Sequence, residues 1–157
     1  MSIHLWLIAL IIVIILLVLR LAMPRLTSSV ASGPIENNGV QALSDCPDSP
    51  NCQSSASSRQ EQSVAPLSIS GNPSLVMATV AEFINSESNA NVVQQQGYYL
   101  HATYKTRLMG YIDDVEFLLD ASTKQLHIRS ASRVGRKDFG ANAKRIELIR
   151  AALAGEI

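Results

Sequence analysis

The chain has 157 residues, with 13 basic residues balanced by 13 acidic ones and a hydrophobic content of 47%. This length leaves room for one soluble domain beside a strongly apolar N-terminus. The formal net charge of zero, together with a membrane segment, disfavours nucleic-acid binding.

Residues 1–23 are predicted to form a transmembrane anchor. Residues 5–19 are all Leu, Trp, Ile, Ala or Val, and about 17 apolar residues span about 26 Å of helix, close to the hydrocarbon core of a bilayer. A chain this small cannot bury a helix that is apolar all round. The competing interpretation is a cleaved signal peptide, but no Lys or Arg precedes the apolar run. We therefore expect an uncleaved, single-pass membrane protein.

The side of the membrane that holds the soluble domain stays open. Arg20 and Arg25 flank the C-terminal end of the apolar run, which favours a cytoplasmic domain. Cys46 and Cys52 favour the other side, because so close a pair can form a disulfide in an oxidising compartment. A disulfide or two structural thiols fit this spacing better than a metal site or a redox pair. Neither a metal nor a cofactor is expected.

The rest of the chain divides into a flexible linker over residues 24–44 and a single α+β domain over residues 45–157. The linker is rich in Ser, Gly, Pro and Asn and has no hydrophobic periodicity. In the domain, Asn72 before Pro73 predicts a helix start, and Asn142 is expected to cap a second helix. In chain order the predicted elements are a strand at 64–69, a helix at 73–86, strands at 91–95, 99–108, 111–120 and 125–134, and the helix that begins at Asn142.

This order predicts a two-layer sandwich in which an antiparallel meander carries both helices on its apolar face. A two-residue turn between the strands at 99–108 and 111–120 would place Lys105 opposite Asp114. A four-residue turn before the next strand would place Glu116 opposite Arg129. On a solvated sheet face each such pair is worth about 0.2–1 kcal/mol. The alternative is a polar cluster that receives a ligand, formed by His101, Glu116, His127 and Arg129.

Asp113 is the exception to this pairing. Strand alternation points it at the apolar face, where a carboxylate needs a partner or a place at the sheet margin. We expect Arg133, or the loop that follows it, to supply the partner. That loop, 133–142, holds two glycines and several basic residues and leads into a helix N-terminus, a place for a phosphate or an acidic headgroup. The candidate ligand-binding residues are Asp113, Glu116, His127, Arg129, Arg133, Asp138 and Asn142.

Four segments carry a family resemblance: CPDSPNC at 46–52, GYIDDVEF at 110–117, RSASRVG at 129–135, and DFG at 138–140 with Asn142, Arg145, Ile146 and Glu147 after it. With these landmarks the chain resembles the domain-of-unknown-function family numbered 1499. Arg136 and Lys137 depart from the uncharged Tyr-Ser pair of that family, so the resemblance does not support an anion site at these two residues. The resemblance implies a bacterial or plastid protein, often anchored to a membrane directly or by a lipid, and with it we expect the anchor in a bacterial inner membrane. It transfers no activity.

Two functions remain as hypotheses. The first is a membrane-tethered module that binds a protein partner or a small anionic ligand through the charged sheet face and the loop 133–142. The alternative is a hydrolase-type enzyme with Asp113, Glu116 and His127 as acid–base groups. Whether the protein is an enzyme is undecided at this stage.

Overall fold

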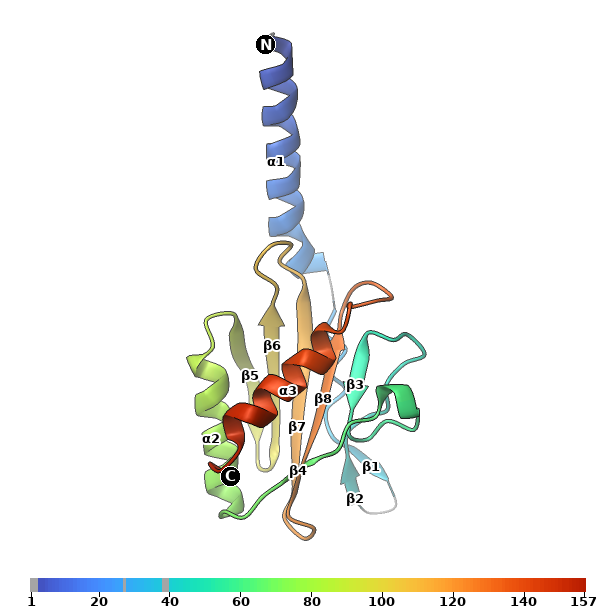
Figure 1. Cartoon of the computed structure of the whole chain (residues 1–157), viewed down its shortest axis with the longest axis vertical. Coiled ribbons are helices and arrows are strands. Elements are labelled where there is room, and N and C mark those ends of the chain that lie inside the picture. Colours follow the sequence, from blue (N-terminus) through green and yellow to red (C-terminus); the bar gives the residue numbers. More distant parts are fainter. Residues whose placement is uncertain (1–2, 27, 38–39) are drawn as a thin grey trace.

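The computed structural model describes residues 3–26, 28–37 and 40–157 (Figure 1). Residues 1–2 of the expected anchor and residues 27, 38 and 39 of the expected linker lie outside this description. Helix α1 (Ile3–Leu26) projects from an α+β domain, and its stretch Ile3–Ala22 is long and apolar enough to cross a membrane. Signal sequences share this length and composition.

The domain is built on a six-stranded antiparallel sheet in the order β3-β8-β7-β6-β5, with β4 also paired to β8. The strands are β3 (Cys52–Ser54), β4 (Leu67–Ser68), β5 (Ala90–Gln96), β6 (Tyr99–Lys105), β7 (Ile112–Asp120) and β8 (Gln125–Ser132). Consecutive strands β5 to β8 are neighbours, which confirms the predicted meander. The edge strand β3 was not predicted, because three residues in a turn-rich segment carry no alternation signal.

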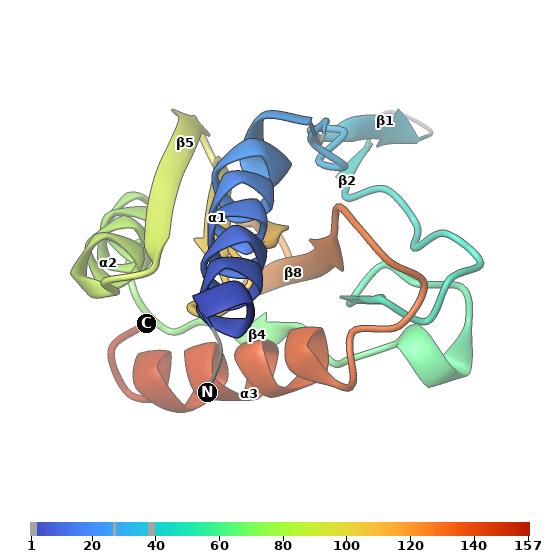
Figure 2. The same ribbon diagram turned by 90° about the horizontal axis from the view of Figure 1, so that it is seen from above.

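Helices α2 (Pro73–Ser86) and α3 (Ala141–Leu153) share one hydrophobic core with the sheet (Figures 1 and 2). Val80 and Ile84 of α2 and Ile146 of α3 are buried in this core. The side chain of Asn72 accepts a hydrogen bond from the Ser74 amide at 2.9 Å, so the predicted cap of α2 is confirmed. The α+β fold class is confirmed.

The predicted strand register is confirmed for one pair of strands and wrong for the other. Glu116 lies opposite Arg129 between β7 and β8, as predicted. Between β6 and β7, however, Asp114 lies opposite Thr103 instead of Lys105. The connection is a loop over residues 106–111 in place of a two-residue turn, closed by the Tyr111 amide bonded to the Thr106 hydroxyl at 2.9 Å. The shift of two residues keeps every side chain on its predicted face.

The segment expected to be a flexible linker is in large part structured. Strands β1 (Ile35–Asn37) and β2 (Val40–Ala42) form a small antiparallel sheet of their own. Residues 29–33, which precede β1 and which we call the strap, bond to the main sheet on the face opposite the helices. Leu43 is buried against Tyr99 and Leu118. Polar composition suggested a free tether here, but long-range contacts hold this segment in place.

Cys46 and Cys52 form a disulfide with their Cα atoms 5.7 Å apart, which confirms the disulfide alternative. The bridge joins Cys46 to the first residue of β3 and packs against Ala131 of β8. A short 3-10 helix, η1 (Gln60–Gln62), follows β3. The side chain of Gln62 is buried and donates to the carbonyls of Pro47 and Ser49, so the loop that the disulfide closes is tied to η1 as well.

Candidate functional site

Strand β7 carries buried acidic side chains on both faces of the sheet. Asp113 faces the helices, whereas Asp114 and Glu116 face the strap, as strand alternation requires. All three are at most 3% exposed. The expectation that these ion pairs lie on a solvated sheet face is therefore wrong, because another layer of polypeptide covers each face.

On the helix face, the partner of Asp113 is Arg145 of α3. The Arg145 guanidinium lies 2.5 Å from the Asp113 carboxylate and also stacks over the Tyr104 ring, 4.9 Å from its centroid. Burial raises the pKa of Tyr104 to about 12, and the negative charge of Glu87 adds to this effect. The prediction that Arg133 or its loop neutralises Asp113 is wrong. The helix that packs over β7 and β8 supplies the charge instead.

Asp138 and Asn142 tie the loop 133–140 to the domain. Asn142 lies inside α3 rather than at its cap, and Gly140 precedes the helix with a φ of 81°. Asp138 accepts hydrogen bonds from the Gly140 amide at 3.1 Å and the Asn142 amide at 2.9 Å. The Asn142 side chain is fully buried, donates to the Asn51 carbonyl and accepts from the Ser130 hydroxyl. Both residues have structural partners that account for their polarity, and the predicted capping role of Asn142 is wrong.

On the strap face, Asp114 is bound from several directions. Arg133 donates to its two oxygens through Nε at 2.9 Å and Nη2 at 2.8 Å, and His101 Nε2 lies 2.7 Å from Oδ1. Burial alone raises the pKa of Asp114. The hydrogen bonds from His101, Arg133 and the Val30 amide outweigh that effect and hold the pKa well below its ordinary value. Asp114 therefore stays ionised in a site from which water is excluded.

Glu116 is the second acidic residue of this face. Arg129 donates to its Oε2 at 2.8 Å, and the Tyr99 hydroxyl donates to its Oε1 at 2.9 Å. Burial raises the pKa of Tyr99, and the negative charge of Glu116 raises it further. The side chains of Arg129 and Glu116 are 4% and 0% exposed. The predicted cross-strand pair exists, but it is a buried ion pair.

The strap completes the coordination of both carboxylates through its backbone. The Val30 amide donates to Asp114 at 2.8 Å, and the Gly33 amide donates to Glu116 at 3.1 Å. In return the Val30 carbonyl accepts from Arg129 at 3.1 Å. Gly33 has a φ of 73°, a backbone conformation that residues other than glycine rarely adopt. The polar cluster that the sequence suggested is thus already occupied by a segment of the same chain.

His127 lies apart from this cluster. It faces the same side as Glu116, but its Nδ1 is 3.2 Å from the hydroxyl of Ser55, and it lies opposite Leu118. Asp113 and Glu116 lie on opposite faces of β7, each paired with an arginine. The acid–base alternative therefore gains no support from this arrangement. Within the described residues no group of His, Cys, Asp and Glu side chains is placed to hold a metal ion.

Sequence reasoning missed Tyr99, Arg145 and the strap as parts of these clusters. Arg145 carries a usable signal, because it follows Asn142 by three residues and so projects from the same side of a helix. The strap has no such signal. It contributes backbone groups and one serine hydroxyl, which composition and periodicity do not distinguish from a linker.

A comparison with protein-family models matches residues 42–153 to DUF1499, described as a protein of unknown function. The chain belongs to the DUF1499 family. The DUF1499 match covers the main sheet, α2 and α3, and begins after the strap and α1. Searches of curated proteins and of solved structures found no match.

Proposed function

We propose that this DUF1499 protein is a membrane-anchored binding module whose strap face receives a polypeptide segment. The observation that carries the proposal is the set of hydrogen bonds between the strap and the main sheet. Two buried carboxylates accept backbone amides of the strap, and a buried arginine donates to a strap carbonyl. In the resting molecule the site is occupied by its own chain, and a protein partner would take the place of the strap.

The chemistry of the site supports recognition of backbone rather than of particular side chains. Asp114 and Glu116 accept from amides that lie three residues apart in the strap, and the left-handed backbone of Gly33 allows both amides to point toward the sheet. Hydrogen bonds to ionised groups are shorter and stronger than neutral ones. The strap sequence, SVASG, is made of small residues. A partner segment would therefore need small residues and a glycine at the position of Gly33.

The apolar helix α1 supports the membrane part of the proposal. Its 20-residue stretch Ile3–Ala22 spans about 30 Å, the thickness of a hydrocarbon core. The disulfide between Cys46 and Cys52 supports a domain on the oxidising side of that membrane. Labelling of intact cells with a membrane-impermeant thiol reagent, with and without reduction, tests this side. Labelling of both cysteines only after treatment with a membrane-impermeant reductant supports it. Labelling in lysed and reduced cells but not in intact cells, before or after reduction, contradicts it.

The test of binding uses the full chain with Val30→Pro. Proline removes the amide hydrogen that Val30 donates to Asp114, so the strap should detach from the sheet more often. The probe is a fluorescent peptide with the sequence of residues 28–36. A tethered strap competes at an effective concentration of roughly millimolar, so the unmodified chain should not bind the peptide at micromolar concentrations. The Val30→Pro chain should bind it.

Two controls make this test specific. Ser28→Pro introduces a proline at an exposed residue just outside the strap and should leave the peptide unbound. A peptide that itself carries Val30→Pro should bind neither chain. If the Val30→Pro protein keeps its circular dichroism spectrum and its disulfide but does not bind the peptide, the strap is a fixed part of the fold and the proposal is refuted.

A further inference from the structure

One edge of the domain lies next to the C-terminal end of α1. The loop 106–111 joins β6 to β7 at this edge, and β8 ends beside the start of β7, since Asp113 lies opposite Ser132. The loop 133–140 therefore leaves the sheet at the same edge. Figure 1 shows both loops on the side of the domain from which α1 projects. We call these two loops the membrane edge.

The loop 106–111 exposes apolar side chains and lies against α1. Leu108 is 79% exposed, and Met109 and Tyr111 are also exposed. The Arg20 guanidinium donates to the Arg107 carbonyl at 2.5 Å, so the loop lies beside the last turn of the stretch Ile3–Ala22. Solvent exposure of three such side chains on one loop is unfavourable unless another apolar phase covers them.

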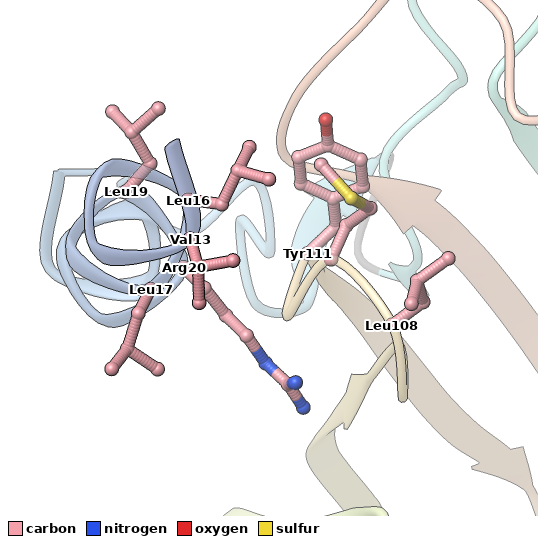
Figure 3. Close-up of a pocket in the computed structure, with 8 residues that line it drawn as sticks. Val13, Leu16, Leu17, Leu19, Arg20, Leu108 and Tyr111 are labelled. Carbon is pink, nitrogen blue, oxygen red and sulfur yellow. The ribbon is translucent and has the colours of Figure 1, made fainter. Parts of the chain in front are cut away.

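An apolar groove of about 380 Å³ separates the loop 106–111 from α1. Figure 3 shows Leu16 and the Tyr111 ring on its two walls, with the Arg20 side chain extending toward the loop. Leu16 lies six residues before Ala22, which places it about 9 Å into a span that ends at Ala22. The groove therefore lies at the depth of the upper acyl chains, next to the interfacial region in which tyrosine and snorkelling arginine side chains are enriched.

The loop 133–140 adds a further exposed apolar side chain and more positive charge. Phe139 is 98% exposed, and Arg136 and Lys137 next to it are exposed as well. Asp138, the acidic residue of this loop, is turned inward onto the start of α3. Exposed basic residues at a membrane surface are attracted by anionic lipids.

From these observations we infer that the membrane edge is a second membrane contact. The loop 106–111 inserts its apolar side chains among the upper acyl chains, and the loop 133–140 binds anionic headgroups. The inference rests on the proposed role of α1 as a membrane anchor. The domain would then be held against the bilayer with the strap face in a fixed orientation, rather than swinging on a tether.

The test measures depth in the full chain reconstituted into phosphatidylcholine vesicles, with and without phosphatidylglycerol. Single tryptophans are introduced as Leu108→Trp, Phe139→Trp or Ala121→Trp in a Trp6→Phe background. Ala121 is the matched control, because it is exposed in the turn between β7 and β8 at the opposite end of the domain. Lipids brominated near the top of the acyl chain quench tryptophans at that depth. The unmodified chain, in which Trp6 is the sole tryptophan, reports on the anchor separately.

We expect quenching at position 108 to be at least about threefold stronger than at position 121, and quenching at position 139 to rise with the phosphatidylglycerol fraction. Equal quenching at positions 108 and 121, with Trp6 quenched, would overturn the inference while leaving the anchor intact. A blue-shifted but unquenched tryptophan at position 108 would mean that protein covers the loop, and this too overturns it. An unquenched Trp6 would refute the anchor and the inference together.

Discussion

The ion pair between Glu116 and Arg129 provides a quantitative test of how the strap face is built. Glu116→Leu removes the carboxylate that accepts from Arg129, from the Tyr99 hydroxyl and from the Gly33 amide. A buried donor without an acceptor costs about 1–3 kcal/mol, and an uncompensated buried charge costs about 3–5 kcal/mol. These terms overlap, so we expect Glu116→Leu to lower the free energy of unfolding by about 3–5 kcal/mol.

The double variant Glu116→Leu with Arg129→Met separates burial from charge. It removes both charges and fills their space with apolar atoms, so it should lose only about 2 kcal/mol. Arg129→Met alone should cost at least about 1 kcal/mol, because Glu116 loses a buried partner. The coupling energy is then at least about 2 kcal/mol, more than the 0.2–1 kcal/mol of an exposed pair. The matched control is Glu147→Gln, because Glu147 forms an exposed pair with Arg150 at 3.6 Å. It should change stability by less than about 0.5 kcal/mol.

The measurement is urea denaturation of the full chain in detergent micelles, followed by circular dichroism and fitted to a two-state transition. Variants whose denaturant dependence changes are excluded, because their denatured states differ. A coupling energy below about 0.5 kcal/mol would mean that water reaches the pair. The description of the strap as a cover that excludes solvent would then be wrong.

Three further predictions use the same denaturation assay. The pKa of Asp114 is depressed in the folded state, so its contribution is complete above the unfolded value and is lost on acidification. Stability should therefore fall as the pH drops below about 4, and Asp114→Asn should flatten this slope; an equally steep slope in the variant contradicts the assignment. Asp113→Ala leaves Arg145 buried without its carboxylate and should cost about 3 kcal/mol, much of it recovered by adding Arg145→Met; a purely additive double variant would refute the pairing. Replacing Cys46 and Cys52 by serine opens a disulfide with a sequence separation of 6 and should cost about 2 kcal/mol; no change in stability would show that the bridge does not constrain the chain.

Local rules were sufficient for the strands β5 to β8, for the start of α2 and for the faces of the sheet. Asn72 before Pro73 marked the start of α2, because a cap and its helix are adjacent in sequence. Alternation placed Asp113 on the helix face and Glu116 on the other, and the turn at 121–124 set the register of Glu116 against Arg129. The register of β6 against β7 was predicted wrongly. A loop that shifts the register by two residues leaves every side chain on the same face, so the alternation pattern does not distinguish the two registers.

The composition of the candidate site depended on contacts between distant parts of the chain. Arg145 reaches Asp113 across 32 residues, and the strap amide of Val30 reaches Asp114 across 84. A backbone amide has the same chemistry at every residue except proline, so no side-chain pattern identifies the one that binds a carboxylate. The residue pattern was sufficient for the apolar N-terminal helix, the meander and the grouping of the acidic residues by face. Their burial, the arginine that neutralises each of them and the cover that the strap forms depend on tertiary packing, because burial and pairing arise when layers distant in sequence come together.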